Sequence, residues 1–78
     1  MVSTLLAHGY KECDFSKEGK SYKKDIVVVT LVDGLVVMRR ETKFENKKDD
    51  FSCYLVFFKG KILTENELVT LLNIADRS

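Results

Sequence analysis

The fold is decided by residues 26–42, whose sequence is IVVVTLVDGLVVMRRET. Two runs rich in β-branched residues flank the dipeptide Asp33-Gly34. This pattern predicts a β-hairpin with a two-residue type I′ turn, because both turn residues need a positive φ that Asp and Gly tolerate. The turn sets the register of the two strands. On one face it pairs Val32 with Leu35, Thr30 with Val37 and Val28 with Arg39. On the other face it pairs Leu31 with Val36, Val29 with Met38 and Val27 with Arg40.

Both faces of this hairpin are apolar near the turn, whereas a hairpin with one face in water alternates apolar and polar residues. A further strand is expected over residues 51–58, and it has the same property. Strict alternation would direct one set of side chains to each face: Phe51, Cys53, Leu55 and Phe57 to one, and Ser52, Tyr54, Val56 and Phe58 to the other. Each face of the predicted sheet therefore needs a cover.

Two helices are expected at the ends of the chain. Ser3 as N-cap and Gly9 as a stop signal indicate a short N-terminal helix. The capping box Thr64-Glu65-Asn66-Glu67 starts a C-terminal helix, in which the Thr64 hydroxyl accepts from the Glu67 N–H and the Glu67 side chain returns to the Thr64 N–H. Leu63 and Leu68 are spaced as a hydrophobic staple around this cap. The apolar stripe of the helix consists of Leu68, Leu71, Leu72 and Ala75.

Upstream of the hairpin, residues 10–15 are expected to form a first strand, and residues 20–25 to extend the strand that begins at residue 26. We therefore predict an α+β fold in one domain, residues 1–78: an antiparallel meander of three to four strands, with both helices packed on one face. A chain of 78 residues buries only about 60% of the surface that its unfolded form exposes, so the core is small.

Composition excludes several classes of protein. No apolar run approaches the roughly 20 residues of a transmembrane helix, and the first residues lack the basic start of a secretory signal. Cys13 and Cys53 lack metal-binding spacing, and two reduced thiols fit a cytoplasmic protein better than a disulfide. The composition is rich in Lys and Asn and has no Pro or Trp, which is typical of low-GC bacteria and their phages.

The sequence predicts no catalytic residue, no cofactor and no metal site. His8 is the one side chain that titrates near neutral pH when unperturbed, and no third residue is indicated to orient a dyad with either cysteine. Asp49 and Asp50, with Glu45 nearby, are adjacent acids in a turn, so their carboxylates are expected to face water rather than converge. We therefore expect a protein that is not an enzyme.

Binding of single-stranded nucleic acid is the alternative function. The first 61 residues hold 12 basic and nine acidic residues, a net charge of +3, while residues 62–78 hold one basic and three acidic residues. This asymmetry is modest for a polyanion-binding surface. Aromatic residues near these cations would supply stacking surfaces. The candidate contacts are Lys23, Lys24, Arg39, Arg40, Lys59 and Lys61.

Protein binding is the leading hypothesis, because the apolar strands exceed what two short helices can cover. Residues 20–25 or 45–50 could instead fold over the second face. The expected partner is a second copy of the chain, which would make a homodimer, or a larger host protein on which a phage-type inhibitor or accessory protein would act. No membrane partner is expected. The candidate interface residues are Val28, Thr30, Val32, Leu35, Val37, Tyr54, Val56 and Phe58.

Overall fold

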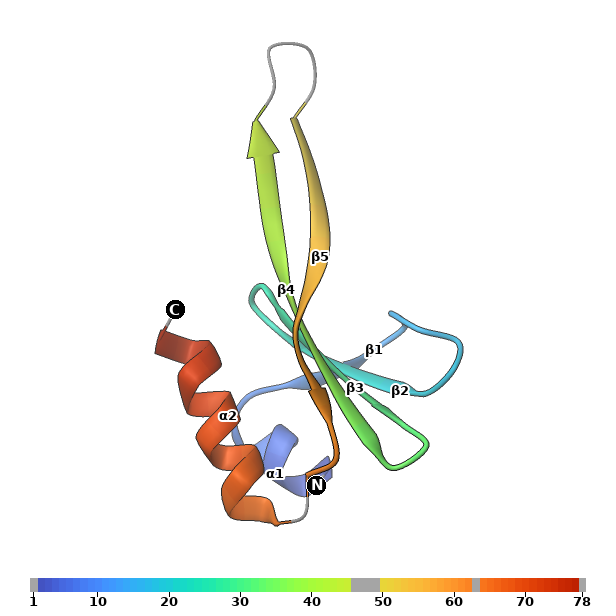
Figure 1. Cartoon of the computed structure of the whole chain (residues 1–78), viewed down its shortest axis with the longest axis vertical. Coiled ribbons are helices and arrows are strands. Elements are labelled where there is room, and N and C mark those ends of the chain that lie inside the picture. Colours follow the sequence, from blue (N-terminus) through green and yellow to red (C-terminus); the bar gives the residue numbers. More distant parts are fainter. Residues whose placement is uncertain (1, 46–49, 63, 78) are drawn as a thin grey trace.

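The computed structural model describes residues 2–45, 50–62 and 64–77 and shows an α+β fold. One antiparallel sheet has the strand order β1-β2-β3-β4-β5, and both helices pack on one face of it (Figure 1). The elements in chain order are α1 (Val2–Ala7), β1 (Lys11–Cys13), β2 (Lys20–Lys24), β3 (Val27–Val32), β4 (Leu35–Glu45), β5 (Asp50–Gly60) and α2 (Glu65–Arg77).

The central hairpin has the predicted turn and register. Asp33 and Gly34 have φ values of 49° and 75°, which is the combination that a type I′ turn requires. All six predicted pairs between β3 and β4 are present, from Val32 opposite Leu35 to Val27 opposite Arg40. The two-residue turn therefore determines which side chains lie on each face.

The number of strands differs from the prediction, because residues 20–25 do not extend β3. The chain reverses at Asp25 and Ile26, and β2 pairs with β3 from Lys24 opposite Val27 outward. Asp25 has a φ of 52°, and the Ile26 carbonyl accepts from the Glu41 N–H at 2.7 Å. Asp is one of the few non-glycine residues that adopt this conformation readily. The reversal turns one long expected strand into two and brings the sheet to five strands.

The helix-covered face of the sheet carries the core. Tyr22 from β2, Val29 from β3 and Met38 from β4 are buried against the two helices. Helix α2 contributes Leu68, Leu72 and Ala75 as predicted, and Leu71 packs at the edge of the cluster. The remaining core residues are Leu5, Tyr10, Val27, Val36 and Ile62.

The helix ends follow their local sequence signals. Gly9 has a φ of 91°, and the N–H groups of Gly9 and Tyr10 donate to the carbonyls of Leu6 and Leu5, which is the Schellman pattern. At α2 the Glu67 N–H donates to Thr64 Oγ1 at 3.2 Å, as predicted. The Glu67 carboxylate accepts from the Thr64 hydroxyl rather than from the expected backbone N–H. Leu63, one half of the predicted staple, lies outside the described residues.

A β-bulge in β5 overturns the strict alternation predicted for this strand. Arg39 is opposite Val56 and Met38 is opposite Phe58, so Phe57 is the extra residue. The shift moves Phe58 from the face of Val56 to the helix-covered face, where it packs against the core. Phe58 therefore packs at the edge of the core and does not share the face of Tyr54 and Val56.

The hairpin of β4 and β5 projects from the body of the protein (Figure 1). Strand β3 pairs with β4 only as far as Arg40, whereas β4 pairs with β5 as far as Glu45 opposite Asp50. Residues 41–45 and 50–54 thus form a two-stranded ribbon, called the arm below. The arm accounts for the elongated shape of the molecule, which measures 44 × 28 × 21 Å.

Candidate functional site

The face of the sheet opposite the helices, called the open face below, carries most of the predicted interface residues. Val28, Thr30 and Val37 are buried there, Val32, Leu35 and Tyr54 are half-buried, and Val56 is 52% exposed. These seven residues share the face because they alternate along their strands and pair across them. Phe58 alone among the predicted set lies on the helix-covered face.

A groove of about 300 Å³ crosses the open face. Its floor is formed by Thr30, Val32, Leu35, Val37 and Val56, all of which were predicted interface residues. The rest of its lining is polar or charged and of mixed sign: Ser16, Glu18, Asp33, Arg39 and Lys59. The groove therefore combines an apolar base with acidic and basic groups around it.

The loop between β1 and β2, residues 14–19, covers part of the open face and bounds the groove. At Gly19 the loop backbone lies so close to β3 that an added Cβ would come within 2.3 Å of the Leu31 carbonyl oxygen. The Phe15 ring reaches Tyr54 on β5, with 4.9 Å between ring centroids and an interplanar angle of 76°. The loop thus contacts the strand at the opposite edge of the sheet. Residues 20–24, which were expected as one possible cover of this face, form β2 within the sheet instead. Residues 46–49 of the other expected cover lie outside the described residues.

Buried polar groups tie Arg39 to the open face. Ser21 Oγ and Thr30 Oγ1 are 3.0 Å apart, and Arg39 Nη1 donates to Thr30 Oγ1 at 3.2 Å. The Arg39 guanidinium carbon lies 5.2 Å from the centroid of the Phe15 ring. The hydroxyl pair and the ring together hold this cation in one position, which is the condition for a specific rather than a diffuse charge contact.

Lys23 extends this basic and aromatic cluster. Its Nζ lies 5.9 Å from the centroid of the Tyr54 ring. A hydrogen bond with the Tyr54 side chain is the main cause that raises the pKa of Lys23, and Glu41 adds a smaller electrostatic contribution. Lys23 therefore stays protonated throughout the physiological pH range.

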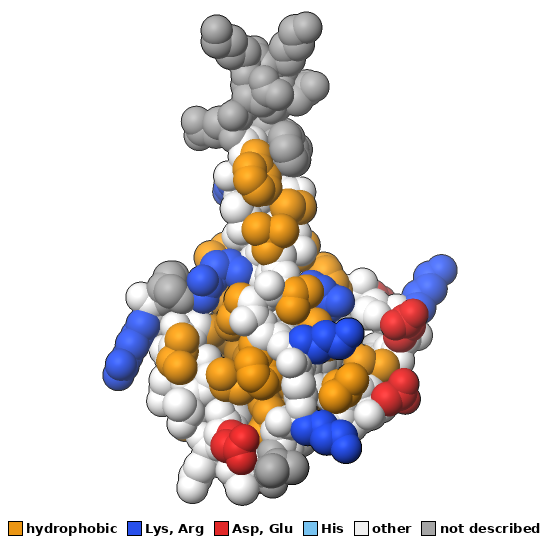
Figure 2. Space-filling model, in the orientation of Figure 1, with side chains coloured by type: hydrophobic (Ala, Val, Ile, Leu, Met, Phe, Trp, Pro, Cys, Tyr) orange, Lys and Arg blue, Asp and Glu red, His pale blue; other side chains and the backbone are white. Residues whose placement is uncertain are grey.

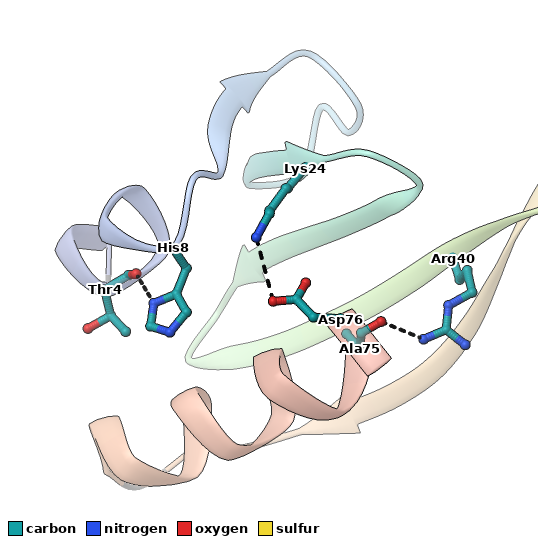
Figure 3. A network of polar contacts seen from close by, with 6 residues as sticks. All are labelled: Thr4, His8, Lys24, Arg40, Ala75 and Asp76. Atoms are coloured by element: carbon teal, nitrogen blue, oxygen red, sulfur yellow. Dashed lines mark hydrogen bonds and ion pairs between the residues drawn. The ribbon is translucent and has the colours of Figure 1, made fainter. Parts of the chain in front are cut away.

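The six predicted nucleic-acid contacts do not form one patch. Lys23, Arg39 and Lys59 lie on the open face, whereas Lys24 and Arg40 turn toward α2 on the other side (Figure 3). Lys24 Nζ is 3.5 Å from the Asp76 carboxylate, and Arg40 Nη2 donates to the Ala75 carbonyl at 3.3 Å near the end of α2. A positive charge near the C-terminal end of a helix is stabilising, so Lys24 and Arg40 stabilise α2. Lys61 follows β5 and is exposed.

The side chains considered for catalysis lie in different elements: His8 follows α1, Cys13 is in β1 and Cys53 is in β5. His8 Nδ1 lies 2.9 Å from the Thr4 carbonyl oxygen at the end of α1 (Figure 3). Cys13 and Cys53 are free thiols on opposite faces of the sheet, opposite Ser21 and Thr42 respectively. Asp49 lies outside the described residues. Within the described ranges, no three His, Cys, Asp or Glu side chains are grouped so that they could hold a metal ion.

A second set of partly exposed apolar side chains lies along the β4–β5 hairpin, where Figure 2 shows apolar side chains on the projecting arm and at its base. Phe44 and Leu55 lie on the helix side of the sheet but beyond the reach of the core, and Phe57 stands at the bulge. The guanidinium carbon of Arg40 lies 4.8 Å from the centroid of the Phe57 ring. Leu55 is 49% exposed, which is close to the value for Val56 on the other face.

Phe15 is the functional candidate that the sequence analysis missed. It was expected to end the first strand, but β1 ends at Cys13 and Phe15 lies in the loop. A single aromatic residue between Asp14 and Ser16, directly before a charged segment with Gly19, is the available signal for such an anchor. It does not reveal that the ring crosses the sheet to Tyr54.

No described helix has the length and apolar character needed to cross a membrane. In comparisons with protein-family models, with curated proteins and with solved structures, no match to this chain was found.

Proposed function

We propose that this protein is a non-enzymatic interaction module, an accessory or inhibitory protein that binds a larger protein partner through the open face of its sheet. The observation that carries the proposal is the groove on that face, with its apolar floor and its surround of mixed charge. Such a composition, apolar at the centre and polar at the rim, is the usual anatomy of a protein–protein interface.

The floor supplies the affinity in this proposal. Val32 and Leu35 are half-buried and Val56 is 52% exposed, so each has apolar surface left to bury against a partner. Burial of apolar surface stabilises a complex by about 25 cal/mol for each Å² removed from water. The deeper Thr30 and Val37 are already buried and form a base for these contacts.

The charged residues around the groove supply the specificity. Arg39 and Lys59 stand with Glu18 and Asp33 around the same floor. A partner must offer charges of both signs in matching positions, and a wrong partner would meet like charges. Arg39 is held by Thr30 and by the Phe15 ring, so little conformational freedom is lost when it binds.

The charged residues around the groove also favour a protein partner over single-stranded nucleic acid. Glu18 and Asp33 would repel a phosphate backbone lying in the groove, and Lys24 and Arg40 face the helix side. A nucleic-acid surface needs a continuous basic track beside its stacking platforms. The Lys23 and Arg39 cluster around Phe15 and Tyr54 is the feature that would serve that alternative.

The test is quantitative affinity capture from a lysate of the source organism with three versions of the immobilised protein: wild type, Val32→Lys and Val2→Lys. Val2 is an exposed valine on α1, so its replacement adds the same charge away from the groove. We expect a protein that wild type and Val2→Lys retain and that Val32→Lys loses by at least about tenfold, a difference of roughly 1.4 kcal/mol in binding.

Two outcomes would contradict the proposal. Equal capture by all three versions would place the binding site elsewhere. Captured material that nuclease removes, and whose retention falls steeply with salt, would favour the nucleic-acid alternative, because binding to a polyanion releases condensed counterions.

A further inference from the structure

We infer that β5 is a dimerisation edge, along which the β5 strand of a second copy of this chain pairs in antiparallel orientation and joins the two sheets into one. This goes beyond the proposed function, because it concerns the outer edge of β5 and a second copy rather than the groove and a larger partner. The two surfaces differ, so either proposal can fail alone.

Strand β5 is a long edge strand. It is last in the order β1-β2-β3-β4-β5 and spans 11 residues, whereas the strand at the other edge, β1, spans three. In an antiparallel pair, alternate residues of an edge strand point their backbone N–H and C=O groups away from the neighbouring strand. The length of β5 therefore offers several such groups in a row to an incoming strand.

The side chains of β5 lack the features that usually protect an edge. Residues 51–58, FSCYLVFF, include no Pro and no Lys, Arg, Asp or Glu. Natural proteins commonly place charged residues or Pro on exposed edges to prevent pairing with another chain. The bulge at Phe57 is the one protective device in the described part of β5, and it confines regular pairing to the segment before it, up to Val56.

The apolar residues in this segment are uncovered on both faces. Leu55 and Val56 are consecutive, point to opposite faces and are 49% and 52% exposed. A partner that packed on one face would bury only one of them. A strand added at the edge would place side chains beside both, because adjacent strands lie about 4.7–4.9 Å apart and contribute residues to each face.

Charge favours a second copy as the occupant. The segment available for regular pairing, residues 52–56, carries no charge, so two copies of it can pair without bringing like charges together. The net charge of +1 adds little repulsion between two copies. The resulting contact is self-complementary about a two-fold axis, the commonest symmetry of soluble dimers.

The test is sedimentation velocity of the full chain between about 1 and 100 µM, a range that brackets a micromolar Kd. Wild type is compared with Leu55→Lys and with the matched control Leu6→Lys. Leu6 on α1 is 53% exposed and Leu55 is 49% exposed, so the control loses the same side chain at nearly the same exposure and gains the same charge. We expect a wild-type species of twice the 9.0 kDa chain mass.

Leu55→Lys should raise the dimer Kd by at least about tenfold, because each copy brings a like charge into the paired segment. Leu6→Lys should change the Kd by less than about twofold. Far-UV circular dichroism of both variants establishes that each is folded. A monomeric wild type throughout the range, or a Leu55→Lys dimer as tight as wild type, would overturn the inference.

Hydrogen exchange distinguishes edge pairing from packing of two faces. Amides of residues 52–56 that point away from β4 should be protected at high protein concentration and should exchange rapidly on dilution. If dimers form but no concentration-dependent protection appears in this segment, edge pairing is wrong and the copies associate through a face. Neither result depends on what binds in the groove.

Discussion

The rings of Phe15 and Tyr54 meet edge to face, with centroids 4.9 Å apart, and connect the loop after β1 to β5 across the open face. This contact joins segments from the two edges of a five-stranded sheet. It also keeps the loop over one end of the groove floor. The contact therefore links the stability of the fold to the shape of the candidate binding surface.

The energy of this ring contact can be measured directly. A double-mutant cycle with Phe15→Ala and Tyr54→Ala should give a coupling free energy of about 0.5–1.5 kcal/mol in urea unfolding, the usual value for an aromatic pair. A matched cycle with Leu6→Ala in place of Phe15→Ala should show no coupling, because Leu6 lies on α1 beneath the other face of the sheet. Additive effects of Phe15→Ala and Tyr54→Ala would show that the loop is not anchored by the rings.

Removal of the Thr30 hydroxyl should destabilise the protein. Thr30 Oγ1 contacts both Ser21 Oγ and Arg39 Nη1, and Ser21 and Thr30 are buried. Thr30→Val keeps the shape and leaves the Ser21 hydroxyl without this partner, at a cost of about 1–3 kcal/mol in the free energy of unfolding. The double variant Ser21→Ala, Thr30→Val should recover part of that loss, since the stranded polar group is gone. A double variant whose loss equals the sum of the two single losses would contradict this account.

The reversal at Asp25 predicts an unusual response to substitution. Asp25 has a φ of 52°, so Asp25→Gly should leave stability nearly unchanged, whereas Asp25→Val should cost about 1–2 kcal/mol because a β-branched residue is strained there. Asp14→Val is the control, since Asp14 is exposed and has no positive φ. Thermal or urea unfolding measures all three. Equal stability of Asp25→Val and Asp25→Gly would mean that the chain does not turn in this way.

The burial of Tyr10 predicts that the protein loses stability at alkaline pH. Burial, with smaller contributions from Asp76 and Asp25, raises the pKa of Tyr10 from its ordinary value of 10.0 to about 12. A folded-state pKa above the unfolded value means that stability is complete below pH 10 and is lost as the pH rises toward 12. Ionisation of this one group should remove about 2 kcal/mol by pH 12.

Tyr10→Phe isolates that contribution from the titration of lysines over the same range. The Tyr10 hydroxyl is buried and has no hydrogen-bond partner among the described residues, so its removal should cost little at pH 7. Urea unfolding between pH 8 and 12 should show a flatter decline for Tyr10→Phe than for wild type. Parallel declines would mean that Tyr10 ionises as readily in the folded protein as in the unfolded chain.

Much of the groove floor could be predicted from the sequence, because it lies on the central hairpin. Once Asp33-Gly34 was identified as a two-residue turn, the positions of Val32, Leu35 and Thr30 on one face followed from strand geometry. The placement of Phe58 could not be predicted in this way. It depends on the bulge at Phe57, where one extra residue in β5 places Phe58 opposite Met38 and against the core.

The sequence by itself determined the hairpin register, the Schellman end of α1 and the apolar stripe of α2, because each depends on residues within a few positions of one another. Tertiary structure decided that the loop at Phe15 crosses the open face, that Lys24 and Arg40 turn toward α2, and that Leu55 and Val56 stay uncovered on opposite faces. These outcomes depend on which distant segments reach a given side chain. Local dihedral preferences and periodicity contain no information about such long-range packing, which only the complete fold provides.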